Sequence, residues 1–106
     1  SRAFVINNTT GGYTSFENNG FESARFNASG NLLLGKSTSS LSTSGFELFS
    51  TGVQWITASN TRPLLLNRTG TGGTENGDIA EFRANGAPVG SVSTISSDLC
   101  IGSSIT

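Results

Sequence analysis

Histidine and methionine are both missing from this chain of 106 residues, and cysteine occurs once. Without histidine, the chain lacks the commonest general base and metal ligand of proteins. A single cysteine provides neither the ligand set of a zinc site nor an internal disulfide. We therefore expect no bound metal, no cofactor and no enzymatic activity. Cys100 stands between Leu99 and Ile101 and is interpreted as a small, inert side chain of a strand.

Charged residues are also scarce, at 12% of the chain, with 6 basic and 7 acidic side chains. A nearly neutral chain lacks the clustered positive charge that displaces counterions from nucleic acid, so no nucleic-acid partner is expected. No polybasic helix or long apolar run is present, so no membrane insertion is expected either. The carboxylates stand singly and are interpreted as solvated or edge-protecting charge, not as the facing pair of a glycosidase. They are Glu17, Glu22, Glu47, Glu75, Asp78, Glu81 and Asp98.

Helical periodicity is the third absence. No apolar residues recur at i, i+3, i+4 and i+7 over a useful length. The chain is instead rich in Ser, Thr, Asn and Gly, and turn signals separate short apolar runs throughout. Seven phenylalanines and one tryptophan argue against disorder, so the pattern predicts an all-β protein. The first residues, Ser1-Arg2-Ala3, read as mid-strand, and we expect a processed or excised piece of a longer protein.

The clearest motif is the dipeptide Asn85-Gly86 between two β-capable runs. This pair predicts a two-residue type I′ turn, because such a turn needs positive φ at both positions. A hairpin over residues 77–92 follows, in which Pro88 occupies a non-hydrogen-bonded position where its missing N–H does not weaken the ladder. The predicted pairs are Ala84–Ala87, Arg83–Pro88, Phe82–Val89 and Ile79–Val92.

The same pattern occurs earlier in the chain, around Ser29-Gly30. Superposing this dipeptide on the later turn places Phe26 on Phe82 and Leu33 on Val89, so one hairpin design is predicted twice. Further strands are expected at residues 3–6, 13–16, 21–26, 46–49, 53–57, 63–67 and 98–102. Residues 36–44 are expected to form a solvated loop, or an exposed strand if the chain is part of an extended fibre. A flexible loop is expected at 69–77.

Two runs, Leu32–Leu34 and Leu64–Leu66, are apolar at every position and do not alternate. A strand buried on both faces explains such a run. A small monomer with no disulfide has few means of burying both faces, whereas an interwound trimer covers the second face with a neighbouring chain. Residues 1–106 are interpreted as one β-rich segment, with hairpins in 1–45 and a shaft or knob in 46–106.

Several of these segments resemble the shaft-and-knob region of bacteriophage tail fibre and tailspike proteins. The similarity is to the segment ahead of an endosialidase-type intramolecular chaperone. It is clearer after Phe46 than before, and Thr71–Asn76 lengthens a loop that is usually short in this family. The matching stretches are Ala28–Lys36, Pro63–Arg68, Gly77–Arg83, Asn85-Gly86, Val89–Val92 and Asp98–Ser103.

The resemblance implies an extracellular, structural role on a virion tail, where the protein takes part in host attachment. Two partners are implied. One is the chain itself, in a homotrimer, and the other is a host cell-surface polysaccharide or receptor. The expected fold is an elongated, hairpin-repeat, intertwined trimer like a triple β-helix or β-prism. The alternative is a monomeric β-sandwich that binds carbohydrate. Trp55 and Tyr13 are candidate glycan contacts, although a packed Trp55 is the simpler interpretation. The residues expected at the trimer core or interface are Leu32, Leu33, Leu34, Leu64, Leu65, Leu66, Ile79, Phe82, Val89 and Val92.

Overall fold

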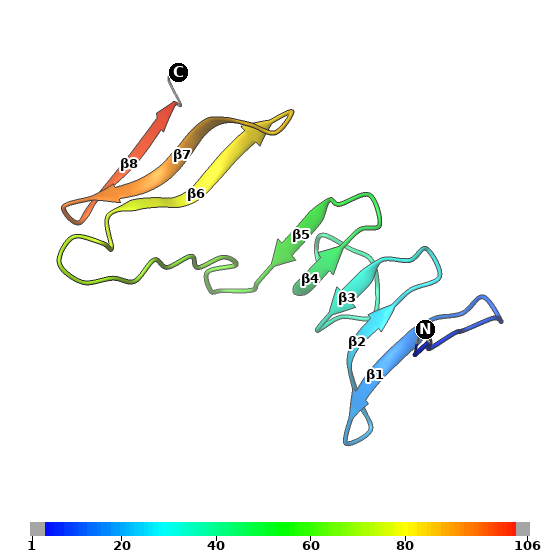
Figure 1. Ribbon diagram of the computed structural model, residues 1–106. Coiled ribbons are helices and arrows are strands. Elements are labelled where there is room, and N and C mark those ends of the chain that lie inside the picture. The colour runs from blue at the N-terminus through cyan, green and yellow to red at the C-terminus, as the bar shows by residue number, and fades with distance from the viewer. Residues whose placement is uncertain (1–3, 104–106) are drawn as a thin grey trace. The chain divides into compact units, whose positions relative to one another are not determined.

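The computed structural model describes residues 4–103, and within this range the chain forms strands and no helix. The predicted all-β class is confirmed. The chain divides into two compact units between Leu64 and Leu65, and each unit contains one antiparallel sheet. In both sheets every strand pairs with its neighbours in sequence, so each sheet is a meander, as the colour order in Figure 1 shows.

The first unit holds a five-stranded sheet in the order β1-β2-β3-β4-β5. Its first hairpin turns at Asn19-Gly20, where φ is 53° and 81°, because asparagine and glycine tolerate the left-handed region that a type I′ turn requires. The strands are β1 (Thr14–Asn18), β2 (Phe21–Phe26), β3 (Leu32–Leu34), β4 (Gly45–Leu48) and β5 (Gln54–Thr57).

The two sides of the first sheet differ sharply in polarity. Residues directly opposite each other in an antiparallel ladder share a face, so the register assigns each side chain to a side. One side carries the row Ser15, Arg25, Leu33, Glu47 and Trp55. The other side, called here the apolar face, carries the two rows Phe16–Ala24–Leu34–Phe46–Ile56 and Thr14–Phe26–Leu32–Leu48–Gln54.

Residues 36–44, called here the strap, fold back over β3 and β4 on the side opposite the apolar face. Leu33 and Glu47 have no exposed surface beneath it. Lys36 opens the strap and places its Nζ 3.2 Å from Oε1 of Glu47. Gly45 closes it at a φ of 138°, and a Cβ there would lie 2.7 Å from the carbonyl oxygen of Leu34. The solvated loop expected at 36–44 is a loop, but its first residue is buried.

The second unit holds a three-stranded sheet of β6 (Gly77–Ala84), β7 (Ala87–Ile95) and β8 (Asp98–Ser103). Asn85 and Gly86 have φ of 51° and 82°, which confirms the predicted two-residue turn. One side of this sheet is polar. The other carries Ala80, Phe82, Val92, Leu99 and Ile101, and is called here the second apolar face.

Two pairs of the predicted hairpin register are wrong. Ala84 does pair with Ala87, and Arg83 with Pro88, but Phe82 pairs with Gly90 and Ala80 pairs with Val92. The ladder shifts by one residue after Pro88, which leaves Val89 as an extra residue, and shifts back at Ile79. Two bulges therefore cancel, because a bulge inserts one unpaired residue into a single strand.

The earlier hairpin forms as predicted but with a longer loop. Phe26 pairs with Leu32 rather than with Leu33. Asn27 closes the loop by donating its N–H to the carbonyl of Asn31, and its own carbonyl accepts from Gly30, whose φ is 83°. This is the three-residue loop in which a turn is followed by a left-handed residue, so the two hairpins do not share one design.

Two predicted strands are absent from the described residues. The segment 63–67 belongs to no sheet, and Leu64, Leu65 and Leu66 are all exposed. Residues 4–6 likewise form no strand, and Ala3 lies outside the described range. Apolar composition alone does not make a strand, because a strand also needs a neighbour to satisfy its backbone N–H and C=O groups.

Candidate functional site

Exposed apolar surface is the dominant feature of this molecule. Leu33 is the one buried hydrophobic side chain in the part of the chain that the structure describes. The total accessible surface is 8240 Å². The size scaling of folded proteins gives about 6,700 Å² for two separate compact units of these sizes. The two units therefore leave roughly 1,500 Å² more surface exposed than two compact bodies would.

The residues expected at a trimer interface fall into four environments. Leu33 is buried under the strap, whereas Leu32 and Leu34 lie on the apolar face. Phe82 and Val92 lie on the second apolar face, beside the extra residues of the two bulges, Ile79 and Val89. No strand contains Leu64, Leu65 or Leu66. Phe16, Phe26, Phe46 and Ile56 join Leu32 and Leu34 on one surface, and that grouping was not predicted.

Tyr13 lies against Arg25 at the β1 edge of the strap side. The guanidinium carbon of Arg25 is 3.7 Å from the centre of the Tyr13 ring. Glu22 accepts two hydrogen bonds from the same guanidinium, at 2.8 and 2.6 Å, and these bonds raise the pKa of Arg25 above its usual value. The Arg25 guanidinium therefore contacts both Glu22 and one face of the Tyr13 ring, while Tyr13 stays exposed.

Trp55 lies on the same side of the sheet, at the opposite edge. It pairs with Glu47 and is half-buried. Its ring meets Phe49 edge-on, with centroids 4.6 Å apart at an angle of 71°. Strands β2, β3 and β4 lie between Tyr13 and Trp55 on this side, so the structure does not bring the two candidate glycan contacts together into one cluster.

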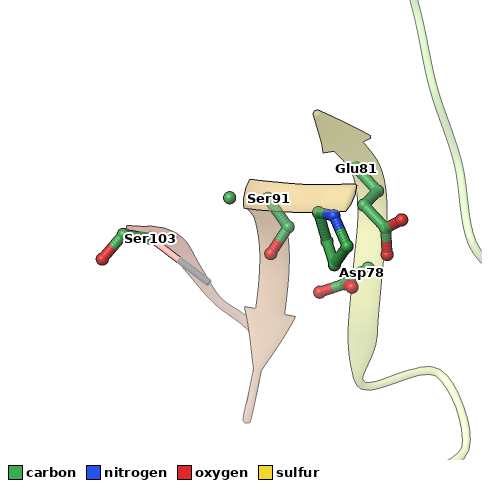
Figure 2. Close-up of a pocket in the computed structure, with 6 residues that line it drawn as sticks. Asp78, Glu81, Ser91 and Ser103 are labelled. Carbon is green, nitrogen blue, oxygen red and sulfur yellow. The ribbon is translucent and has the colours of Figure 1, made fainter. Parts of the chain in front are cut away.

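A small pocket on the second sheet gathers polar side chains that are predicted from the sequence to be scattered. Asp78 and Glu81 on β6 line it together with Ser91 on β7, as Figure 2 shows. Residues three apart in a regular strand face opposite sides, but the bulge at Ile79 places both carboxylates opposite serines two apart on β7. The bulge thereby places the side chains of Asp78 and Glu81 on the same side of the sheet. Pro88, Gly90 and Ser103 complete the lining.

The pocket is too small for a sugar-processing site. Its volume is about 90 Å³, whereas ligand pockets occupy about 300–1,000 Å³. Glu81 already accepts a hydrogen bond from Nε of Arg83. Within residues 4–103, no group of three His, Cys, Asp or Glu side chains is placed to hold a metal ion. A few water molecules are the natural content of this space.

The interpretation of every carboxylate as solvated or edge-protecting charge is wrong for Glu47. This side chain is fully buried, pairs with Lys36 and accepts a hydrogen bond of 2.6 Å from Oγ of Ser39. The sequence offered one signal for it. Glu47 stands in the middle of an apolar run, where a charge must be either at an exposed edge or paired in the interior.

Comparison with protein-family models, with curated proteins and with solved structures found no match to this chain. A search of the described residues found no helix that is both long and apolar enough to cross a membrane.

Proposed function

We propose that this chain is a structural and host-attachment segment of a trimeric phage tail fibre or tailspike. In this role, the chain works as a homotrimer and presents a surface that contacts host cell-surface glycan. The resemblance to such proteins supports this family, and it rests on the stretches Ala28–Lys36, Pro63–Arg68, Gly77–Arg83, Asn85-Gly86, Val89–Val92 and Asp98–Ser103. The observation that supports the proposal most directly is that each of the two sheets has one apolar face that its own unit does not cover.

Self-association buries apolar surface that the isolated chain leaves exposed. Burying a side chain the size of Leu or Phe is favourable by about 1.5–3 kcal/mol, and ordering one residue costs about 1–2 kcal/mol in backbone entropy. With Leu33 as the one buried hydrophobic side chain of the described range, the interior of a single chain contributes little against that entropy. Copies that cover each other's apolar faces recover the missing burial.

The glycan contact is proposed at Tyr13 rather than at Trp55. Tyr13 is exposed and fixed by Arg25, whereas Trp55 is half-buried against Phe49. A fixed aromatic ring can stack on a sugar with little loss of side-chain entropy.

The proposed role does not include catalysis. The test is binding of the chain to host polysaccharide: Tyr13→Ala should weaken it at least tenfold and Tyr13→Phe should retain it, while release of reducing sugar would contradict the non-enzymatic role.

A second candidate is a monomeric β-sandwich that binds carbohydrate. It is favoured by the same two apolar faces, because two sheets with one apolar side each can pack face to face. The two candidates differ in mass. Light scattering on the purified chain should give about three times 10.9 kDa for the fibre segment and 10.9 kDa for the sandwich.

A further inference from the structure

Tyr13 belongs to a part of the chain that carries amide and hydroxyl groups but no charge. Among the described residues, positions 4–16 contain no acidic or basic side chain. The side chain of Asn8 orders the turn that precedes the ring. Its Nδ2 donates to the carbonyl of Tyr13 at 3.0 Å, and its Oδ1 accepts from the backbone N–H and the hydroxyl of Thr10 at 3.1 and 2.9 Å. An exposed ring next to neutral donors and acceptors suits the apolar face and the hydroxyl groups of a sugar.

Arg25, the cation in contact with the ring, already has a partner for its charge. Its guanidinium carbon lies 3.7 Å from the centre of the Tyr13 ring, and its Nε and Nη2 donate to the two carboxylate oxygens of Glu22. The pair as a whole is electrically neutral, so it offers no net positive charge to an incoming carboxylate or phosphate. Lys36, on the same side of the sheet, is buried and paired with Glu47.

A β-bulge brings a second carboxylate to this edge of the sheet. The register between β1 and β2 shifts by one residue, which leaves Ser23 as an extra residue and sets Glu17 directly opposite Glu22. Glu17 and Glu22 therefore lie on the same side as Arg25, and Glu17 is exposed. Two carboxylates stand against one guanidinium there, so the excess charge is negative.

We infer that the glycan bound at Tyr13 is an uncharged sugar, and that Glu17 and Glu22 exclude acidic ones. This inference rests on the glycan contact in the proposed function and adds the chemical class of the ligand. A carboxylate, phosphate or sulfate on the sugar would approach an excess of negative charge, because the Arg25 charge is already satisfied. An uncharged sugar avoids this repulsion and needs only the ring face and hydrogen bonds.

An array of immobilised oligosaccharides tests the ligand class, with members matched in pairs that differ by one carboxylate or sulfate group. The unmodified chain should bind uncharged members, and each acidic counterpart should bind about fivefold more weakly, which is the effect of one unit charge at close contact in water. Affinity for the uncharged members should not change with salt concentration, because salt screens only charges. Tyr13→Ala should weaken this binding at least tenfold.

Charge variants test the role of the carboxylates. Glu17→Gln should narrow the difference between the two members of a pair about fivefold. Glu22→Gln leaves the Arg25 charge unpaired and should narrow it further, and a thermal unfolding curve shows whether this variant is folded. Asp98→Asn is the matched control, because it removes an exposed carboxylate from the second sheet and should leave the difference unchanged.

The outcomes separate this inference from the proposed function. Preferential binding of acidic members that is lost in Tyr13→Ala would overturn the inference and leave the glycan contact at Tyr13 in place. A difference within pairs that neither Glu17→Gln nor Glu22→Gln changes would overturn the role of the carboxylates. If no member binds, or if Tyr13→Ala binds as well as the unmodified chain, the inference and the glycan contact at Tyr13 both fail.

Discussion

Nζ of Lys36 lies 3.2 Å from Oε1 of Glu47, and neither side chain has any exposed surface. The ion pair joins the first residue of the strap to the middle of β4. Ser39 donates to the second carboxylate oxygen, and Nζ of Lys36 also donates to the carbonyl of Ser40 at 2.8 Å. Oε1 has no hydrogen-bond partner besides the ion-pair contact. The strap is therefore attached to the sheet by this ion pair, by the hydroxyl of Ser39 on Glu47 and by a hydrogen bond of 2.8 Å from Oγ1 of Thr57 to the carbonyl of Leu41.

Breaking this pair should destabilise the protein strongly. Lys36→Met leaves the Glu47 carboxylate buried without a cation, and such a loss typically costs about 3–5 kcal/mol. Urea denaturation at a fixed protein concentration measures the change. Glu81→Gln breaks an exposed pair with Arg83 and serves as the control, for which less than about 1 kcal/mol is expected. Equal effects of the two substitutions would mean that the strap pair is not buried in solution.

Gly90 should not tolerate a side chain. A Cβ at this position would lie 2.6 Å from the carbonyl oxygen of Gly102 on the paired strand. Gly90→Ala should therefore lower the free energy of unfolding by about 1–3 kcal/mol. The matched control is Gly102→Ala, since a Cβ there meets nothing within 4 Å. A Gly90→Ala variant as stable as Gly102→Ala would contradict the register in which Gly90 pairs with Ser103 and Phe82.

Shortening Leu33 should destabilise the fold. Leu33→Ala removes the buried side chain under the strap, and a cost of about 2–5 kcal/mol is expected in the free energy of unfolding.

Leu65 is 67% exposed within one chain. If Leu64–Leu66 also contact a neighbouring copy, as the sequence predicts, Leu65→Asp should reduce the assembled fraction seen by sedimentation velocity. A Leu65→Asp chain that assembles fully would remove this segment from the interface.

The sequence predicts the local features of this fold well. Strand β2 has the predicted bounds, Asn85-Gly86 forms the predicted turn, and β8 begins where the pattern places it. Each of these depends on neighbouring residues: turn dipeptides fix φ, and short apolar runs fix strands. The inferred all-β class follows from them.

The bulges and the buried pair could not be predicted in the same way. A bulge depends on how one ladder adjusts to its partner, so the shift at Val89 and the return at Ile79 have no signature of their own. Asp78 and Glu81 lie on the same side of the sheet because of the second shift, so their proximity could not be predicted from the sequence either. Glu47 is buried because the strap folds back over it, which is a tertiary event that composition does not encode.

The division of Leu32–Leu34 between two environments clarifies why the run does not alternate. Leu33 packs under the strap of its own chain, while Leu32 and Leu34 lie on the apolar face. The run Leu32–Leu34 is expected to be buried on both sides, and on the strap side the chain itself buries it, at Leu33. The other side is the surface that we propose is covered by further copies.

The molecular mass of the unmodified chain in solution is the most direct test of the account. Sedimentation equilibrium over a range of protein concentrations gives this mass without assumptions about shape. We predict a single species of about three times 10.9 kDa that unfolds and dissociates in one step, because folding and assembly are coupled. A stable, folded species of 10.9 kDa at all concentrations would contradict the account and favour the monomeric sandwich.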